Sequence, residues 1–300
     1  MWSEERETYF ASSNIEAKLN LCSEGVSAAL SAAQCAWLRR GVSGILLNPD
    51  FAQDQTCGEK LLRKLAVEAI SCARAANLDT PVVLVETALS PEKAANYYGD
   101  VGANSVFSQA LVSTVRRTTP EIALEFHSAL LNAPQDNLPT WITSSMNGSR
   151  ISTRYGNEMV DAITLLALTL PGAAVIQQGD ELGAADTILE WASSTNTCWP
   201  NAAAASAAPF PWDDSIKAGF TAGEPWLPLS PNYRYANAKA EFANDLSHVG
   251  VVRVAAAMRK SPAIGPHAEI KRLGDAIAIL RWGGTGSLLV VSNVAKVQTE

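Results

Sequence analysis

Short apolar runs alternate with amphipathic segments along the first 180 residues. Four runs, residues 42–47, 81–86, 141–143 and 173–176, are almost wholly apolar, which is typical of strands that are covered on both faces. Between them, apolar residues recur at helical spacing over residues 19–38, from about 58 to 77, after residue 119 and over 156–170. This alternation predicts parallel βαβ units, in either an open doubly wound sheet or a (β/α)8 barrel.

Two of these helices have recognisable start signals. Ser90-Pro91-Glu92 and Thr119-Pro120-Glu121 each combine a capping hydroxyl, a proline in the first turn and an acidic residue that favours the helix N-terminus. We therefore expect helices to begin at these two points.

The pattern changes after Gly183. Residues 184–247 contain few periodic segments and many aromatic residues and prolines, which predicts a long excursion, and a helix is expected again over residues 247–260. Three strand-like pieces, residues 269–273, 276–282 and 287–294, follow with glycine-containing turns between them. They predict an antiparallel meander.

Composition narrows the possible partners. The 300 residues carry a formal net charge of −7, and charged residues make up 18% of the chain. Lysine and arginine cluster only in pairs such as Arg39-Arg40, so a nucleic-acid partner is excluded. No apolar stretch reaches the roughly 20 residues that a membrane helix needs, and charges at Glu4–Glu7 argue against a signal peptide.

The cysteines and histidines do not suggest a metal site. The five cysteines, at positions 22, 35, 57, 72 and 198, form no C-x-x-C pair, and an odd number cannot all pair within one chain. We expect buried free thiols. The three histidines, His127, His248 and His267, lie far apart, so neither a metal nor a cofactor is expected.

Five ordered segments together carry a family resemblance over about residues 9–294. They are Trp37-Leu38-x-x-Gly41-Val42-Ser43-Gly44; Val85-Glu86 with Tyr97-Tyr98-Gly99-Asp100; Trp141 to Arg154; Leu170-Pro171-Gly172 with Gly179-Asp180-Glu181-Leu182-Gly183; and Pro211-Trp212-Asp213 through Ala218-Gly219-Phe220, Trp226-Leu227-Pro228 and Asn232-Tyr233 to Asn237. In this order they resemble the α-amylase/α-glucosidase family of glycoside hydrolases. The last segment is also similar to the glucosidase-like heavy chains of heteromeric amino-acid transporters.

The resemblance implies an α/β fold, the C-terminal part of a (β/α)8 TIM barrel followed by a truncated all-β C-terminal domain. Residues 14–262 would form the partial barrel from the family's fourth strand onward, with residues 184–247 as a long loop. Residues 263–300 would begin the antiparallel β domain. The first three barrel strands have no counterpart, so the chain is expected to be a fragment of a longer product.

The resemblance also implies positions for the family's three catalytic carboxylates. The nucleophile position falls on Asn48, the acid/base on Glu86 and the third acid on Asn147, while the arginine that orients the nucleophile is replaced by Leu46. Retaining glycoside hydrolysis needs two carboxyl groups that face the anomeric carbon. Because an amide is a poor nucleophile, the sequence predicts that the chain does not hydrolyse glycosides.

Several residues have a structural interpretation beside the functional one. Glu86 without its partners is expected to form structural hydrogen bonds rather than to act in catalysis, and Asp50 is a disfavoured substitute nucleophile because Pro49 interrupts the strand. Arg150 could bind a sugar, but we expect it and Arg154 to pair with nearby acids. Two further expectations close the set: Trp191, Trp199, Trp212 and Trp226 anchor loop packing rather than stack on sugars, and the sequon Asn147-Gly148-Ser149 is a possible glycosylation site.

The favoured function is a non-catalytic ectodomain that resembles a transporter heavy chain. It would act as chaperone and docking surface for a transporter light chain at the extracellular face of the plasma membrane. The alternative is an α-glucosidase of the maltase type that acts on α-glucoside sugars, or an inactive fragment of one. A decayed relic without a stable fold is argued against by the intact helix start signals.

Overall fold

The computed structural model describes residues 2–3, 8–9, 19–51, 57–112, 117–145, 148–189 and 205–295. The chain divides into two compact units. Unit 1 comprises Met1–Phe107 and Asn132–Leu138, and unit 2 comprises Ser108–Leu131 and Pro139–Glu300. The domain boundary that the sequence predicted between residues 262 and 263 falls within unit 2, and it stays a prediction.

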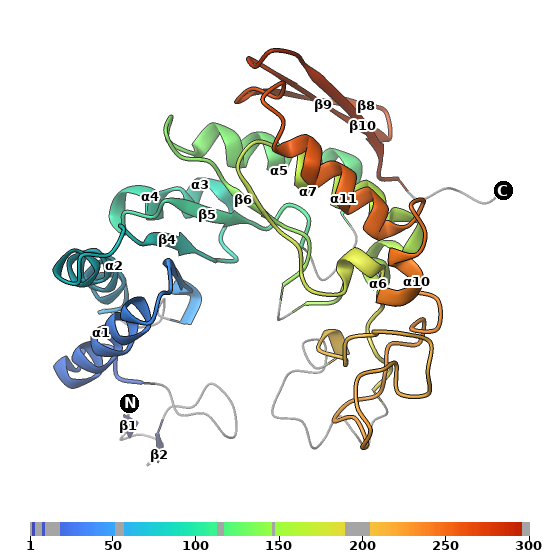
Figure 1. Cartoon of the computed structure of the whole chain (residues 1–300). Coiled ribbons are helices and arrows are strands. Elements are labelled where there is room, and N and C mark those ends of the chain that lie inside the picture. Colours follow the sequence, from blue (N-terminus) through green and yellow to red (C-terminus); the bar gives the residue numbers. More distant parts are fainter. Residues whose placement is uncertain are drawn as a thin grey trace. The chain divides into compact units, whose positions relative to one another are not determined.

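Unit 1 is built from parallel βα elements, shown in blue to teal in Figure 1. Its sheet has the order β3-β4-β5, and both pairings are parallel, with Leu46 opposite Leu84 and Val85 opposite Val106. Helix α2 connects β3 to β4, as the alternation of the sequence predicts. The elements are β1 (Trp2–Ser3), β2 (Thr8–Tyr9), α1 (Glu24–Arg39), β3 (Gly44–Leu47), the 3-10 turn η1 (Pro49–Phe51), α2 (Gly58–Ala75), β4 (Val82–Val85), α3 (Pro91–Ala94), α4 (Asn96–Asp100) and β5 (Ser105–Ser108).

The core of unit 1 lies between α2 and the sheet. Leu61, Leu65 and Ala66 repeat at helical spacing on α2 and pack with Val83 and Val85 of β4, and all five are at most 8% exposed. The predicted stripe on this helix is therefore the face that is buried.

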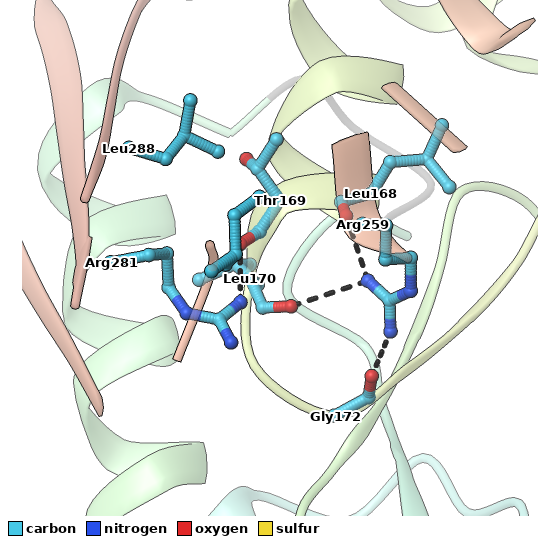
Figure 2. Close-up of a pocket in the computed structure, with 8 residues that line it drawn as sticks. Leu168, Thr169, Leu170, Gly172, Arg259, Arg281 and Leu288 are labelled. Carbon is cyan, nitrogen blue, oxygen red and sulfur yellow. Dashed lines mark hydrogen bonds between the residues drawn. The ribbon is translucent and has the colours of Figure 1, made fainter. Parts of the chain in front are cut away.

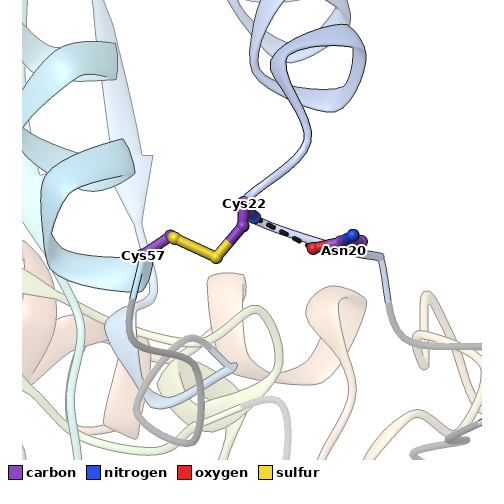
Figure 3. The surroundings of a disulfide bond; sticks show 3 residues. All are labelled: Asn20, Cys22 and Cys57. Carbon is purple, nitrogen blue, oxygen red and sulfur yellow. Dashed lines mark hydrogen bonds between the residues drawn. A yellow bond between two sulfur atoms is a disulfide. The ribbon is translucent and has the colours of Figure 1, made fainter. Parts of the chain in front are cut away.

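Two disulfide bonds join the region around α1 to α2, which corrects the expectation of free thiols. Cys22, just before α1, is bonded to Cys57, which directly precedes α2, as Figure 3 shows. Cys35 on α1 is bonded to Cys72 on α2, and the two helices pack against each other. The spacing of the sequence did not reveal these pairs because they form only once the helices are side by side; Cys198 lies outside the described residues.

Unit 2 contains a parallel strand pair, a set of helices and an antiparallel sheet. Strands β6 and β7 are parallel, with Trp141 opposite Ala174, and β8, β9 and β10 form the predicted meander in the order β10-β9-β8. The elements are α5 (Thr119–Asn132), β6 (Thr140–Ile142), α6 (Ile151–Tyr155), η2 (Asn157–Met159), α7 (Val160–Thr169), β7 (Ala173–Val175), η3 (Asp180–Leu182), α10 (Ala238–Phe242), α11 (His248–Arg259), β8 (His267–Leu273), β9 (Ala276–Trp282) and β10 (Leu288–Asn293).

One continuous core unites these elements of unit 2. Phe126 of α5 packs edge-on against Trp141 of β6, with ring centroids 5.3 Å apart, and both side chains are fully buried. Ile163 of α7 and Ile277 and Ile279 of β9 belong to the same buried cluster. The antiparallel sheet thus shares a buried core with helices α5 and α7 of unit 2.

Three expectations about elements need correction. Strand β5 was not predicted, because Ser105 and Ser108 at its ends hide its buried character. The single helix expected over residues 156–170 begins as the 3-10 turn η2 and continues as α7, and it is preceded by α6, which ends at Gly156 with a φ of +92°. At the start of α5 the cap is Thr118 rather than Thr119, since the Thr118 N–H and hydroxyl both donate to the Glu121 carboxylate.

Candidate functional site

Asn48 and Glu86 follow the carboxyl ends of two neighbouring parallel strands of unit 1. Asn48 comes directly after β3 and Glu86 directly after β4. The Glu86 N–H donates to the Leu47 carbonyl over 3.0 Å, which continues the strand pairing up to this point. In parallel βα folds this edge of the sheet carries the functional side chains.

Asn48 supports the backbone of the turn that follows it. Its Oδ1 accepts a hydrogen bond from the Asp50 N–H over 3.0 Å, at the start of η1. An asparagine oxygen that caps its own loop in this way is a common turn device. The side chain at the nucleophile position of the resemblance is therefore neutral, and its oxygen is engaged in the fold.

Asp50 is held against the segment that follows Glu86. Its Oδ1 accepts from the Thr87 hydroxyl over 2.6 Å, and its Oδ2 accepts from the Ala88 N–H over 2.7 Å. Thr87 is itself buried, with 1% of its surface exposed. The two hydrogen bonds link the loops that follow β3 and β4 and fix the orientation of the Asp50 carboxylate.

Glu86 is half-buried beside this carboxylate. Burial and, second, the negative charge of Asp50 raise the pKa of the Glu86 carboxyl above its usual range. Burial and the charge of Asp50 also raise the pKa of the Tyr97 phenol. Glu86 and Asp50 thus form a pair of neighbouring acids, of which Asp50 is held in place by two hydrogen bonds.

The third-acid position cannot be placed in this geometry. Asn147, the residue of the sequon that would carry a glycan, and the preceding Met146 lie outside the described residues. Their roles stay predictions.

In unit 2, Arg150 lies in a buried ion pair. Its side chain is 7% exposed, its Nη1 lies 3.4 Å from Oδ1 of the fully buried Asp180, and the same nitrogen donates to the Gln178 carbonyl over 2.8 Å. Asp180 Oδ2 accepts from the hydroxyls of Thr143 and Ser144. The structure therefore agrees with the interpretation of Arg150 as a partner of an acid, and Asp180 is a residue that sequence reasoning had not singled out.

Among the residues that the structure describes, Arg154 does not form the expected pair with an acid. Its guanidinium donates to the backbone carbonyls of Leu111, Thr143 and Ser149 over 2.6 to 2.8 Å. Burial lowers the pKa of this guanidinium. Three backbone carbonyls therefore bind Arg154 where we predicted a carboxylate.

Arg150 also lines a hollow of about 430 Å³ whose other walls include the aromatic side chains of Phe210, Trp212, Phe220 and Trp226. Trp212 and Trp226 are 51% and 61% exposed there, so they are not buried anchors of the loop. Trp212 packs edge-on against Phe210, with ring centroids 4.6 Å apart. Trp191 and Trp199 lie outside the described residues.

Comparisons with known proteins identify the class of protein to which this chain belongs, that of the barrel glycoside hydrolases. The family model described as the alpha-amylase catalytic domain matches residues 96–265. Trehalulose synthase MutB superposes on 94% of this chain and 62% of its own length, with a TM-score of 0.78 and 20% identity. The chain belongs to the alpha-amylase family, and its fold is the C-terminal part of a (β/α)8 barrel followed by an antiparallel β segment.

Curated relatives include both enzymes and transporter subunits. Alpha-glucosidase of Apis mellifera is 29% identical over 197 residues, 60% of this chain and 34% of that protein. Maltase A1 of Drosophila melanogaster is 26% identical over 229 residues, 71% of this chain and 40% of the enzyme. The amino acid transporter heavy chain SLC3A1 of Rattus norvegicus is 35% identical over 107 residues, 35% of this chain and 15% of that protein. The chain thus spans well under half the length of each.

Proposed function

We propose that this chain is part of a glucosidase-like domain that does not hydrolyse glycosides and serves instead as a docking surface for a transporter light chain. The observation that carries the proposal is the state of Asn48. Its neutral side chain stands where the resemblance requires a nucleophile, and its oxygen caps the following loop over 3.0 Å. Without a covalent nucleophile, two-step retaining hydrolysis lacks its first intermediate.

Asp50 does not readily replace the missing nucleophile. An attack on an anomeric carbon would require a carboxylate directed at the sugar, whereas the hydrogen bonds from Thr87 and Ala88 hold the Asp50 carboxylate against the loop that follows β4. A carboxylate fixed in this way is well suited to hold two loops together. Under this proposal the strand ends keep the acids Glu86 and Asp50 and their local structure, but they do not catalyse hydrolysis.

The disulfides support an extracellular location. Two bonds, Cys22–Cys57 and Cys35–Cys72, join the same pair of helical segments, and such bonds persist in oxidising compartments. No helix among the described residues has the length and apolarity to cross a membrane. An ectodomain that docks on a membrane-embedded light chain agrees with both findings and with the heavy-chain relatives.

Maltose turnover tests the catalytic half of the proposal. The full natural protein that contains this chain should release no more glucose from maltose than its Glu86→Gln variant. A matched control is Glu121→Gln, an acid at a helix start in unit 2. Turnover that is lost in Glu86→Gln and kept in Glu121→Gln would overturn the proposal in favour of an α-glucosidase.

Co-expression tests the docking half. With a transporter light chain from the same organism, the protein should co-purify as a defined complex and raise the amount of light chain at the cell surface. If the light chain reaches the surface equally well without the protein, the docking role is wrong, whatever the maltose assay shows.

The second candidate function, an α-glucosidase, is favoured by one specific observation. The Glu86 carboxyl is half-buried next to the charge of Asp50, and its pKa is raised as in a general acid. For this candidate Asp50 would have to act as nucleophile, so Asp50→Asn and Glu86→Gln should abolish turnover to a similar extent.

A further inference from the structure

A hollow of about 150 Å³ in unit 2 is lined by two arginines from different elements. Arg259 ends α11, and Arg281 lies near the end of β9. Figure 2 shows both guanidinium groups directed at the segment that leads from α7 into β7. The remaining lining residues are Leu168, Thr169, Leu170, Gly172, Ile264 and Leu288.

Both guanidinium groups bind only neutral oxygens among the described residues. Arg259 Nη1 donates to the carbonyls of Leu168 and Leu170 over 2.7 and 3.3 Å, and its Nη2 donates to the Gly172 carbonyl. These are carbonyls at and after the last turn of α7, which have no partner within the helix. The contacts position Arg259, but they supply no full negative charge.

Arg281 has the same kind of environment. Its Nη1 donates to the Thr169 carbonyl, its Nη2 to the Gly265 carbonyl, each over 2.8 Å, and its Nε to the His267 carbonyl over 3.3 Å. Burial and the nearby charge of Arg259 lower the pKa of the Arg281 guanidinium. Two positive charges thus lie close together in a partly desolvated place.

Three other arginines of unit 2 differ in this respect, whereas Arg154 is likewise bound by backbone carbonyls. Arg117, Arg150 and Arg253 each form an ion pair, with Glu125, Asp180 and Asp245 respectively. Within the described part of the chain, neither Arg259 nor Arg281 has a carboxylate within ion-pair distance. A partly buried charge without a counter-ion is costly, and an added anion would relieve the repulsion between the two.

Donors remain for such an anion. A guanidinium has five N–H groups, and in the described structure the carbonyls leave Arg259 Nε and the second hydrogens of several terminal nitrogens without a partner. The hollow has about five times the roughly 30 Å³ that a water molecule occupies in the liquid. That volume admits a single tetrahedral oxyanion.

We propose that the hollow between α7, α11 and β9 binds one phosphate group through Arg259 and Arg281. A phosphate carries up to two negative charges at neutral pH, which matches the two guanidiniums better than a single carboxylate does. The ligand would clamp the end of α7 to the antiparallel sheet. The site uses none of the residues at the ends of β3 and β4.

Thermal unfolding in phosphate tests the site. With ionic strength held constant by sodium chloride, inorganic phosphate should raise the Tm of the wild-type chain in a saturable way, and acetate should do so less. Arg281→Gln should raise the fitted Kd for phosphate about tenfold or more, because a charge-assisted hydrogen bond is lost. The Kd of Arg281→Lys, which keeps the charge but not the planar guanidinium, should lie between those of the wild type and Arg281→Gln.

The control is Arg272→Gln, which removes an exposed arginine from the neighbouring strand β8. It should leave the Kd for phosphate unchanged. A wild-type Tm that does not respond to phosphate beyond its response to chloride would overturn the proposal, even if the Arg281 variants failed to fold. Equal responses in wild type, Arg281→Gln and Arg272→Gln would overturn it as well.

Discussion

The two units differ in the charged groups that surround their buried or half-buried acidic residues. In unit 1, Asp50 and Glu86 lie close together at a half-buried strand end, and the charge of Asp50 adds to the effect of burial in raising the pKa of the Glu86 carboxyl. In unit 2, Asp180 is fully buried, but Arg150 and two hydroxyls surround it. The buried acid of unit 2 thus has a counter-ion, whereas in unit 1 one acid lies close enough to another to raise its pKa.

The means of stabilisation differ in the same way. Unit 1 has two disulfides, which join cysteines that are 35 and 37 residues apart in the sequence. Unit 2 has a core that runs continuously from α5 through α7 to the antiparallel sheet. Substitutions and conditions that act on one of these means should leave the other unit largely unchanged.

The largest effect is expected at the buried ion pair. Asp180→Ala leaves the Arg150 charge buried and uncompensated, which should lower the free energy of unfolding of unit 2 by about 3–5 kcal/mol. Asp180→Asn, which can still accept from Thr143 and Ser144, should cost less. Asp50→Ala is the matched variant in unit 1, and with two hydrogen bonds lost it should cost about 1–2 kcal/mol.

Hydrogen exchange resolved by peptide measures both changes in the same experiment. Asp180→Ala should deprotect η3 and α6, whereas Asp50→Ala should act on the loops after β3 and β4. If Asp50→Ala were the more destabilising variant, the contrast between the units would be wrong.

The disulfides give the second largest effect. The double variant Cys35→Ala/Cys72→Ala should lower the stability of unit 1 by about 2–4 kcal/mol, because the unfolded chain regains the freedom of a long loop. Reduction with dithiothreitol should weaken protection in α1 and α2 and leave α7 unchanged. Equal loss of protection in α7 would show that the two units do not respond separately.

The sequence predicted most of the fold because burial pattern and secondary structure agree in most segments. The runs that became β3, β4, β6 and β7 are short and apolar, and the predicted class is confirmed. Strand β5 was not predicted because serines lie at both of its ends. A buried serine hydroxyl needs a hydrogen-bond partner, and that partner comes from tertiary structure. The Ser105 hydroxyl, for example, donates to the Leu138 carbonyl over 2.6 Å.

The candidate site was predictable only in part. Parallel strands place Asn48 and Glu86 at one edge of the sheet, so their proximity follows from the pattern alone. Asp50 accepts hydrogen bonds from Thr87 and Ala88, which lie 37 and 38 residues further along the chain. A local sequence pattern cannot predict contacts at this separation. The same holds for Asp180, whose partners Arg150 and Thr143 come from other elements.

A smaller effect tests the sign of the charge balance in unit 1. Because burial and Asp50 raise the Glu86 pKa in the folded state, folding favours protonated Glu86; this contribution is present below the unfolded pKa near 4.5 and is lost as pH rises through the folded pKa. Glu86→Gln should therefore stabilise unit 1 at pH 7, by at most about 1 kcal/mol because the side chain is only half-buried. Urea unfolding at pH 7 and pH 4 should show the gain only at pH 7, and a loss at pH 7 would contradict this account.

The smallest effect concerns a charged pair of unit 2 that lies near its surface. His248 Nδ1 lies 2.7 Å from Asp161 Oδ1, and this hydrogen bond raises the His248 pKa although burial opposes it. Since the folded pKa is the higher one, the stability from this pair is complete below the unfolded value of 6.5 and is lost as pH rises through the folded pKa. His248→Gln should thus cost a few tenths of a kcal/mol at pH 5.5 and almost nothing at pH 8.5, because nearly half of the Asp161 side chain is exposed to solvent. Asp161→Asn should remove the same pH dependence and the exposed control His127→Gln should not, so a profile shared by all three variants would assign the effect to something other than this pair.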